Sequence, residues 1–370
     1  MTDPRLTPLA AALPATVPFT GPEALERRRG QPFRARLGAN ESAFGPSPLA
    51  VAAMERAARE AWMYGDPENH DLRHALAARH GCDPAHVVMG EGIDGLLGLL
   101  VRLTVEAGTP VVASAGAYPT FAFHVRGFGG RLLAVPYEGD RADAPALAGL
   151  AREAGARLLY LANPDNPTGS LLGAGEVEAL LAALPPSCLL VLDEAYAEFA
   201  PEESLLRLDP ADPRLIRLRT FSKAHGLAGL RVGYALGPAP LVAAFDRVRN
   251  HFGLGRVAQA GALAALADEG WPREVARLTA RARRRIGEVA RASGLRPLPS
   301  HANFAAIDCG GDGPLARAVL EGLLARGVFA RMPGVAPLDR CVRVTAGPDA
   351  SLDAFAEALP GALAQARAGA

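Results

Sequence analysis

Apolar residues follow two rhythms along the first part of the chain. Short, nearly continuous apolar runs such as 189–192 alternate with longer segments of helical spacing, as at 95–105, 145–154 and 175–184. Continuous apolar runs are typical of strands that are covered on both faces of a parallel sheet. The pattern predicts seven strands, at 86–89, 110–113, 131–136, 157–161, 188–192, 215–219 and 231–236. Their alternation with helices indicates an α/β domain with a doubly wound, mostly parallel seven-stranded sheet.

The pattern changes after Gly237. Long helical segments are predicted over 240–268 and 271–293, followed by strands at 304–308, 328–331 and 341–345 and helices at 314–326 and 352–368. This succession predicts a smaller α+β domain. We expect an N-terminal arm over 1–40, a large domain over 41–250 and a small domain over 251–370.

Composition narrows the classes of function. The chain has 39 basic and 39 acidic residues, which provides no electrostatic case for binding nucleic acid or an anionic membrane. Four scattered cysteines form no Cys-x-x-Cys pair, so we expect buried thiols in a reducing cytoplasm rather than disulfides or zinc. His70 and His74 lie one helical turn apart without an evident third ligand, so no metal site is predicted. The chain begins without a signal-peptide pattern and contains no apolar run of membrane-spanning length, so we expect a cytoplasmic protein.

Residues that follow the predicted strands are the first candidates for chemistry, because ligands bind beyond the carboxyl ends of strands in doubly wound sheets. Asp193-Glu194-Ala195-Tyr196 follows the strand at 188–192. A buried carboxylate at this place requires a cationic partner. A protonated pyridinium nitrogen is one such partner. A helix cap or a structural ion pair is the alternative, and the four residues alone favour that alternative.

Lys223 follows the strand at 215–219 and is the only lysine of the chain. A loop lysine is more often a surface residue than a nucleophile. In a chain that otherwise uses arginine for positive charge, however, the single lysine suggests a task that a guanidinium cannot perform. A primary amine can lose its proton and form a Schiff base with an aldehyde. Ser222 and Arg231 flank this lysine, and both side chains are natural phosphate ligands.

Three further loops carry candidate groups. The segment Asn163-Pro164-Asp165-Asn166-Pro167-Thr168-Gly169 predicts a rigid turn that presents an amide side chain. Gly90-Glu91-Gly92-Ile93-Asp94-Gly95 matches the G-x-G-x-x-G pattern of nicotinamide-binding proteins, but the expected acidic residue about 20 positions on is absent. The free N–H groups at such a helix start bind any phosphate. Tyr118 is equally compatible with stacking on a flat ring and with a place in the core.

Taken in order, these motifs resemble the fold-type I aminotransferases, which depend on pyridoxal 5′-phosphate (PLP). The signature run comprises Asn166-Pro167-Thr168-Gly169, Asp193-Glu194-Ala195-Tyr196 and Ser222-Lys223 with Arg231. Within this group the chain most resembles the histidinol-phosphate aminotransferases. Matching segments, spread from about Leu37 to the C-terminus, are Ala39-Asn40-Glu41-Ser42, Tyr64-Gly65-Asp66-Pro67, Arg219-Thr220-Phe221-Ser222-Lys223-Ala224 and Val342-Arg343-Val344-Thr345-Ala346-Gly347.

The resemblance implies a role for each matching residue. Lys223 would form the Schiff base with PLP and move the proton, and Asp193 would keep the pyridine nitrogen protonated. Asn166 and Tyr196 would bind the ring oxygen, and Tyr118 would stack on the ring. The phosphate would meet Gly92, Ile93, Asp94, Ser222, Arg231 and, from the other subunit of a homodimer, Tyr64. The substrates, an amino donor and a 2-oxo acid, would be bound by Arg343, Arg331 and Asn40.

Several alternatives remain open from the sequence. Gly95 stands where the family usually has an acidic residue, and Gly116-Ala117 stands where Pro-Thr is frequent. The substrate could therefore be histidinol phosphate with 2-oxoglutarate, or an aromatic or other amino acid. A decarboxylase similar to the threonine-phosphate decarboxylases is a further alternative. A nicotinamide dehydrogenase and a PLP-sensing regulator represent other classes, and the latter would need a DNA-binding module for which the length leaves no obvious room.

Overall fold

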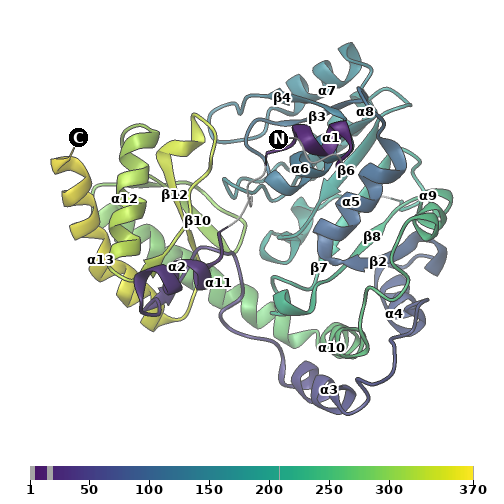
Figure 1. Cartoon of the computed structure of the whole chain (residues 1–370), viewed down its shortest axis with the longest axis horizontal. Coiled ribbons are helices and arrows are strands. Elements are labelled where there is room, and N and C mark those ends of the chain that lie inside the picture. The colour runs from purple at the N-terminus through teal and green to yellow at the C-terminus, as the bar shows by residue number, and fades with distance from the viewer. Residues whose placement is uncertain (1–4, 15–19, 208, 370) are drawn as a thin grey trace.

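The computed structural model describes residues 5–14, 20–207 and 209–369 (Figure 1). Its main sheet has seven strands in the order β2-β8-β7-β6-β5-β3-β4. These strands are β2 Val87–Glu91, β3 Pro110–Ser114, β4 Arg131–Val135, β5 Leu158–Ala162, β6 Leu189–Asp193, β7 Leu215–Thr220 and β8 Val232–Leu236. β8 runs antiparallel to β2 and β7, and all other neighbours pair in parallel. The predicted seven-stranded, mostly parallel sheet is confirmed.

Helices cover both faces of this sheet, which explains the continuous apolar strands. Alternate residues of β5 point to opposite sides. Leu158 and Tyr160 pack with α5 Gly92–Thr104 and α6 Pro119–Gly127. Leu159 and Leu161 pack with α7 Ala144–Glu153 and α8 Ala174–Ala183.

A further group of helices covers the sheet at its β2–β8 edge, on the face that α7 and α8 cover elsewhere. Here α3 Pro48–Ala58, α4 His70–His80 and α10 Arg256–Ala267 pack against one another and against the strands. Figure 1 shows α3 and α10 together at the lower margin of the molecule.

The C-terminal elements form a second group around a small antiparallel sheet. β10 Phe304–Asp308 pairs with β9 Arg296–Pro297 and with β12 Cys341–Thr345. The covering helices are α11 Gly270–Ala292, α12 Gly313–Ala325 and α13 Asp349–Ala368, grouped on the left of Figure 1.

The N-terminal segment contains α1 Pro8–Ala12, α2 Pro22–Arg29 and the short strand β1 Ala35–Arg36. β1 pairs in parallel with β11 Val328–Phe329, and Leu37 lies in the same core as α12 and α13. The domain boundaries expected at residues 40 and 250 stay predictions.

The helical prediction for 240–268 is wrong in one respect. The segment is divided into α9 Ala239–Ala244, a 3-10 turn at Phe245–Arg247, and α10, which begins only at Arg256. Gly253 lies in the interruption and packs closely on a distant segment, because a Cβ there would overlap the Glu91 carboxylate. Helical spacing alone does not register such a contact between distant segments. Among the described residues, no helix is both long and apolar enough to cross a membrane.

Candidate active site

The carboxyl ends of three neighbouring parallel strands, β5, β6 and β7, bring the predicted residues together. The register pairs Ala162 with Asp193 and Asp193 with Leu218, so the ends of β5 and β6 lie level and β7 continues beside them. The turn with Asn166 follows β5, Asp193 is the last residue of β6, and Lys223 follows β7. Strand ends that converge in this way form the usual ligand position of a doubly wound sheet.

Asp193 is a buried carboxylate with two hydrogen-bond donors. Its Oδ2 accepts a hydrogen bond of 2.7 Å from the Tyr160 hydroxyl, and its Oδ1 accepts one of 3.0 Å from the Ala195 backbone N–H. Burial raises the pKa of Asp193 to about 6, although both hydrogen bonds lower it. The group is therefore poised to bind a cationic N–H that would replace the lost solvation.

The amine of Lys223 is buried beside other cations. Its Nζ donates a 2.9 Å hydrogen bond to the Asn40 carbonyl oxygen and lies 5.7 Å from the centroid of the Tyr196 ring. Burial, with a further contribution from Arg343, lowers the pKa of Lys223 to about 8. A lysine with this pKa has far more neutral amine near physiological pH than an ordinary lysine, and the neutral amine is the nucleophile.

Phosphate-binding groups converge next to this lysine. Gly92, Ile93 and Asp94 form the first turn of α5, and Gly92 has a positive φ of 72°. The Arg231 guanidinium donates to Ser222 Oγ at 3.4 Å and to Asp94 Oδ2 at 3.3 Å. A Cβ on Gly92 would lie 2.4 Å from Arg231 Nη2, and L side chains rarely adopt the φ of this residue, so both features favour glycine beside the guanidinium. Backbone N–H groups, a hydroxyl and a guanidinium are thus grouped around the start of α5.

Tyr118 lies between these phosphate-binding groups and the core. Its hydroxyl donates a 2.8 Å hydrogen bond to Asp94 Oδ1, and its ring is packed against the apolar residues under α5. Burial, followed by the nearby Asp94 carboxylate, raises the pKa of Tyr118 above its usual range, so the phenol keeps its proton.

The small sheet contributes the opposite wall. Arg343 of β12 donates to Asn166 Oδ1 and lies 5.1 Å from the centroid of the Phe304 ring. Its Nε is buried without a hydrogen-bond partner among the described residues. Asn40 donates a 3.0 Å hydrogen bond to the hydroxyl of Tyr196, whose pKa is raised to about 12, chiefly by burial. Contacts therefore connect the surroundings of Lys223 with four further predicted residues: Asn40, Asn166, Tyr196 and Arg343.

Arg331 and Tyr64, the last two predicted residues, do not lie beside Lys223. Arg331 is bridged to Arg343 through the backbone, and its Nη2 donates to the Thr20 carbonyl oxygen at 3.1 Å. Tyr64 lies at the surface, where 78% of it is exposed and its ring packs on Phe252 at a centroid distance of 4.8 Å. Within one chain, the structure brings Arg331 to the edge of the site and leaves Tyr64 outside it.

Sequence reasoning missed Tyr160 and the surroundings of Glu194. Tyr160 lies inside an apolar strand, and only its polar hydroxyl distinguishes it from a core residue. Glu194 is fully buried and accepts hydrogen bonds from Arg217 and Arg219 at 2.9–3.0 Å. Two arginines at alternate positions of an otherwise apolar strand were the available signal for this ion pair.

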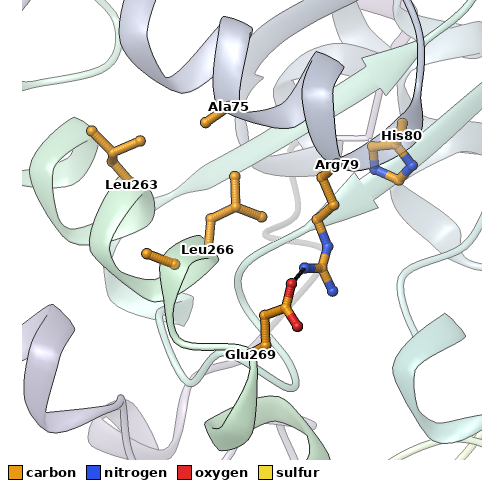
Figure 2. Close-up of a pocket in the computed structure, with 7 residues that line it drawn as sticks. Ala75, Arg79, His80, Leu263, Leu266 and Glu269 are labelled. Atoms are coloured by element: carbon orange, nitrogen blue, oxygen red, sulfur yellow. Dashed lines mark hydrogen bonds and ion pairs between the residues drawn. The ribbon is translucent and has the colours of Figure 1, made fainter.

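A hollow of about 560 Å³ lies elsewhere, between α4 and α10, and Figure 2 shows the ion pair of Arg79 and Glu269 at its side. None of the predicted site residues lines this hollow. Its lining consists of Ala75, Arg79, His80, Leu263, Leu266, Ala267 and Glu269. Within residues 5–14, 20–207 and 209–369, no group of three or more His, Cys, Asp or Glu side chains could hold a metal ion.

Residues 35–359 match the family described as aminotransferase class I and II. The chain belongs to this family. Histidinol-phosphate aminotransferase of Moorella thermoacetica is 33% identical over 362 residues, covering 97% of this chain and 93% of its own length. Histidinol-phosphate aminotransferase 1 of Mesorhizobium japonicum is 38% identical over 331 residues, covering 88% of this chain and 89% of its own length.

Among solved structures, histidinol-phosphate aminotransferase from Sinorhizobium meliloti in complex with pyridoxal-5′-phosphate is 52% identical, with a TM-score of 0.95. The alignment covers 100% of this chain and 99% of that one. The fold and the aminotransferase class expected from the motifs are confirmed. An aminotransferase takes an amino donor and a 2-oxo acid, and the grouping around Lys223 is where this chain offers the chemistry for them.

Proposed function

We propose that this aminotransferase uses PLP to transfer the amino group of histidinol phosphate to 2-oxoglutarate. The observation that carries the proposal is the position of the only lysine. Its buried amine shares one spot with a buried carboxylate, a phosphate cradle and two arginines on the opposite wall. The relatives that are named histidinol-phosphate aminotransferases support the choice of substrate.

The residues present fit PLP group by group. The amine of Lys223 suits the aldehyde carbon, and Asp193 suits the protonated ring nitrogen. The phosphate would be held by Gly92, Ser222 and Arg231. A side chain at Gly92 would displace the Arg231 guanidinium, whereas glycine leaves it in place. Among the remaining candidates, the ring oxygen would be bound by Asn166 and Tyr196, the ring face would be covered by Tyr118, and the phosphate would also meet the backbone of Ile93 and Asp94.

When bound, PLP supplies a ring that accepts the electron pair of the substrate Cα–H bond. The protein supplies the proton transfer and the binding. Lys223 Nζ would take the proton from the substrate Cα and later return it, which its lowered pKa permits. Asp193 would hold the proton on the ring nitrogen, and the surrounding walls would exclude water from the reacting atoms.

Two neighbouring arginines suit the charged substrates. Arg331 and Arg343 exchange backbone hydrogen bonds of 3.3 and 2.6 Å, so their side chains start from adjacent positions. Arg343 would bind the carboxylate of 2-oxoglutarate and, in the other half-reaction, the phosphate ester of histidinol phosphate. Arg331 and Asn40 would border the same space. Guanidinium groups are well matched to both anions.

We also propose a homodimer in which Tyr64 reaches the partner's phosphate cradle. Trp62, Tyr64 and Phe252 expose 82%, 78% and 50% of their surfaces. Tyr64 and Phe252 pack on each other, and exposed aromatic side chains that lie together are typical of an interface. Sedimentation of the loaded protein at the mass of one chain would contradict this part of the proposal. The four free thiols support a reducing, cytoplasmic location.

A half-reaction screen tests the proposal. The PLP-loaded protein is mixed with single amino donors, and conversion of the cofactor absorbance to that of its amine form is followed. We expect histidinol phosphate to react faster than phenylalanine or tyrosine, and the variant Lys223→Ala to lose both the lysine-linked absorbance and turnover. Reaction with aromatic amino acids but not with histidinol phosphate would overturn the substrate, and full activity of Lys223→Ala would overturn the site.

A further inference from the structure

Tyr160 makes a buried contact with Asp193 that no catalytic role assigned above explains. It lies in β5, is 1% exposed, and donates a 2.7 Å hydrogen bond from its hydroxyl to Asp193 Oδ2. Its ring is stacked on Phe121 of α6, with centroids 4.6 Å apart and planes inclined by 16°. The phenol is therefore held from two sides, by packing on its ring and by the hydrogen bond at its hydroxyl.

The strand register explains why a tyrosine reaches this carboxylate. Tyr160 is paired with Val191, and Asp193 lies two residues further along β6 on the same face of the sheet. From this position the tyrosine side chain is long enough for its hydroxyl to reach Asp193 at the end of β6. A phenylalanine would fill the same volume without a donor.

Both oxygens of Asp193 are thereby fixed. Oδ2 receives the Tyr160 hydroxyl and Oδ1 receives the Ala195 backbone N–H at 3.0 Å. Donors to a carboxylate favour its ionised form, whereas burial favours the neutral form. Of the groups that lower the pKa of Asp193, the Tyr160 hydroxyl has the largest effect, ahead of the Ala195 N–H and Lys223.

Other charged and titratable groups face this pair from each neighbouring element. Asp94 of α5 opposes ionisation of Asp193, and Lys223 after β7 favours it. Tyr118 and Asp165 face Tyr160, and Tyr196 faces Asp193 from the next turn. The pKa of Tyr160 itself is raised far above its usual range, first by burial and then by Asp193, so the phenol remains a donor at every relevant pH.

We propose that Tyr160 is a positioning residue that holds Asp193 ionised and directed at the ring nitrogen of the cofactor. This inference rests on the proposed function, because it gives Asp193 a pyridinium partner. Tyr160 would touch neither substrate nor cofactor. Its hydroxyl occupies one carboxylate oxygen from behind and leaves the free lone pairs of Asp193 for the ring N–H.

The variant Tyr160→Phe removes only the hydroxyl, and Tyr137→Phe is a matched control. Tyr137 is also buried and donates a 3.0 Å hydrogen bond to a buried carboxylate, Asp165 Oδ1. The first measurement uses the cofactor-free proteins labelled with ¹³C at aspartate carboxyl groups. Infrared difference spectra against Asp193→Asn identify the Asp193 band, which is titrated with pH. We expect its midpoint to rise by about one pH unit or more in Tyr160→Phe and to stay unchanged in Tyr137→Phe.

The second measurement uses the loaded enzymes. Tyr160→Phe should lower kcat at neutral pH by about twofold or more, because a midpoint raised from about 6 to about 7 leaves about half of Asp193 protonated. KM for the amino donor should change little, and the fall in kcat should be smaller at higher pH. Thermal unfolding of both variants shows whether each remains folded to a similar degree. An Asp193 midpoint that is the same in Tyr160→Phe and the unmodified protein would overturn the inference. Failure of the unmodified protein to bind PLP would refute the proposed function, while the cofactor-free titration would still decide whether Tyr160 keeps Asp193 ionised.

Discussion

The pH dependence of the rate at which the Lys223 amine reacts provides a sensitive test of the site, because this is the only lysine in the chain. Burial, and next the positive charge of Arg343, lowers the pKa of its amine from an ordinary 10.5 to about 8. A lower pKa favours the neutral amine. At pH 7 the neutral fraction should be about 300 times that of an ordinary lysine.

The assay is reductive methylation of the cofactor-free protein with formaldehyde and cyanoborohydride at a series of pH values. Mass spectrometry of the peptide that contains Lys223 measures the rate. We expect the rate to rise about tenfold for each pH unit below 8 and to level off above that value, since the amine is then already neutral.

An exposed reference amine in the same chain provides the control. The variant Arg367→Lys places a lysine in the last turn of α13, where residue 367 is exposed. Its rate should continue to rise towards about pH 10.4. If Lys223 levels off at the same pH as the reference lysine, its amine does not experience the burial and charge described here, and the reasoning fails.

Three further predictions follow from the site. Asp193→Asn should retain PLP but slow the half-reaction by about tenfold or more, because a charge-assisted hydrogen bond is lost; an unchanged stopped-flow rate would make Asp193 merely structural. Glu194→Gln should lower the free energy of unfolding in urea by about 3–5 kcal/mol, because Arg217 and Arg219 lose their buried counter-charge. Gly233→Ala should weaken PLP binding about tenfold or more in equilibrium dialysis, because its Cβ would lie 2.8–2.9 Å from backbone atoms at the start of α5; unaltered binding would show that this turn yields freely.

The elements that the sequence predicted well are those with local causes. All seven strands of the main sheet were located, because strands covered on both faces must be apolar throughout. The division of 240–268 and the helix α6 were not predicted. Gly253 approaches Glu91 from a distant segment, and nothing within its own segment records that approach.

The same distinction applies to the candidate site. Asp193, Lys223 and Asn166 could be selected from the sequence because they follow strands whose carboxyl ends must meet at one edge of a parallel sheet. Arg343 could be named only through resemblance, and its contact with Asn166 joins residues far apart in the chain.

The sequence alone determined which strands exist, and therefore which residues stand at their ends, since hydrophobic burial acts on each segment through its own pattern. Only the tertiary structure decided the contacts between those ends. The hydroxyl of Tyr160 meets Asp193 because β5 and β6 pair in one register, and a shift of one residue would turn the ring to the other face of the sheet. Register and packing between segments are properties of the assembled fold, so the hydroxyl that binds the buried Asp193 carboxylate can be found only there.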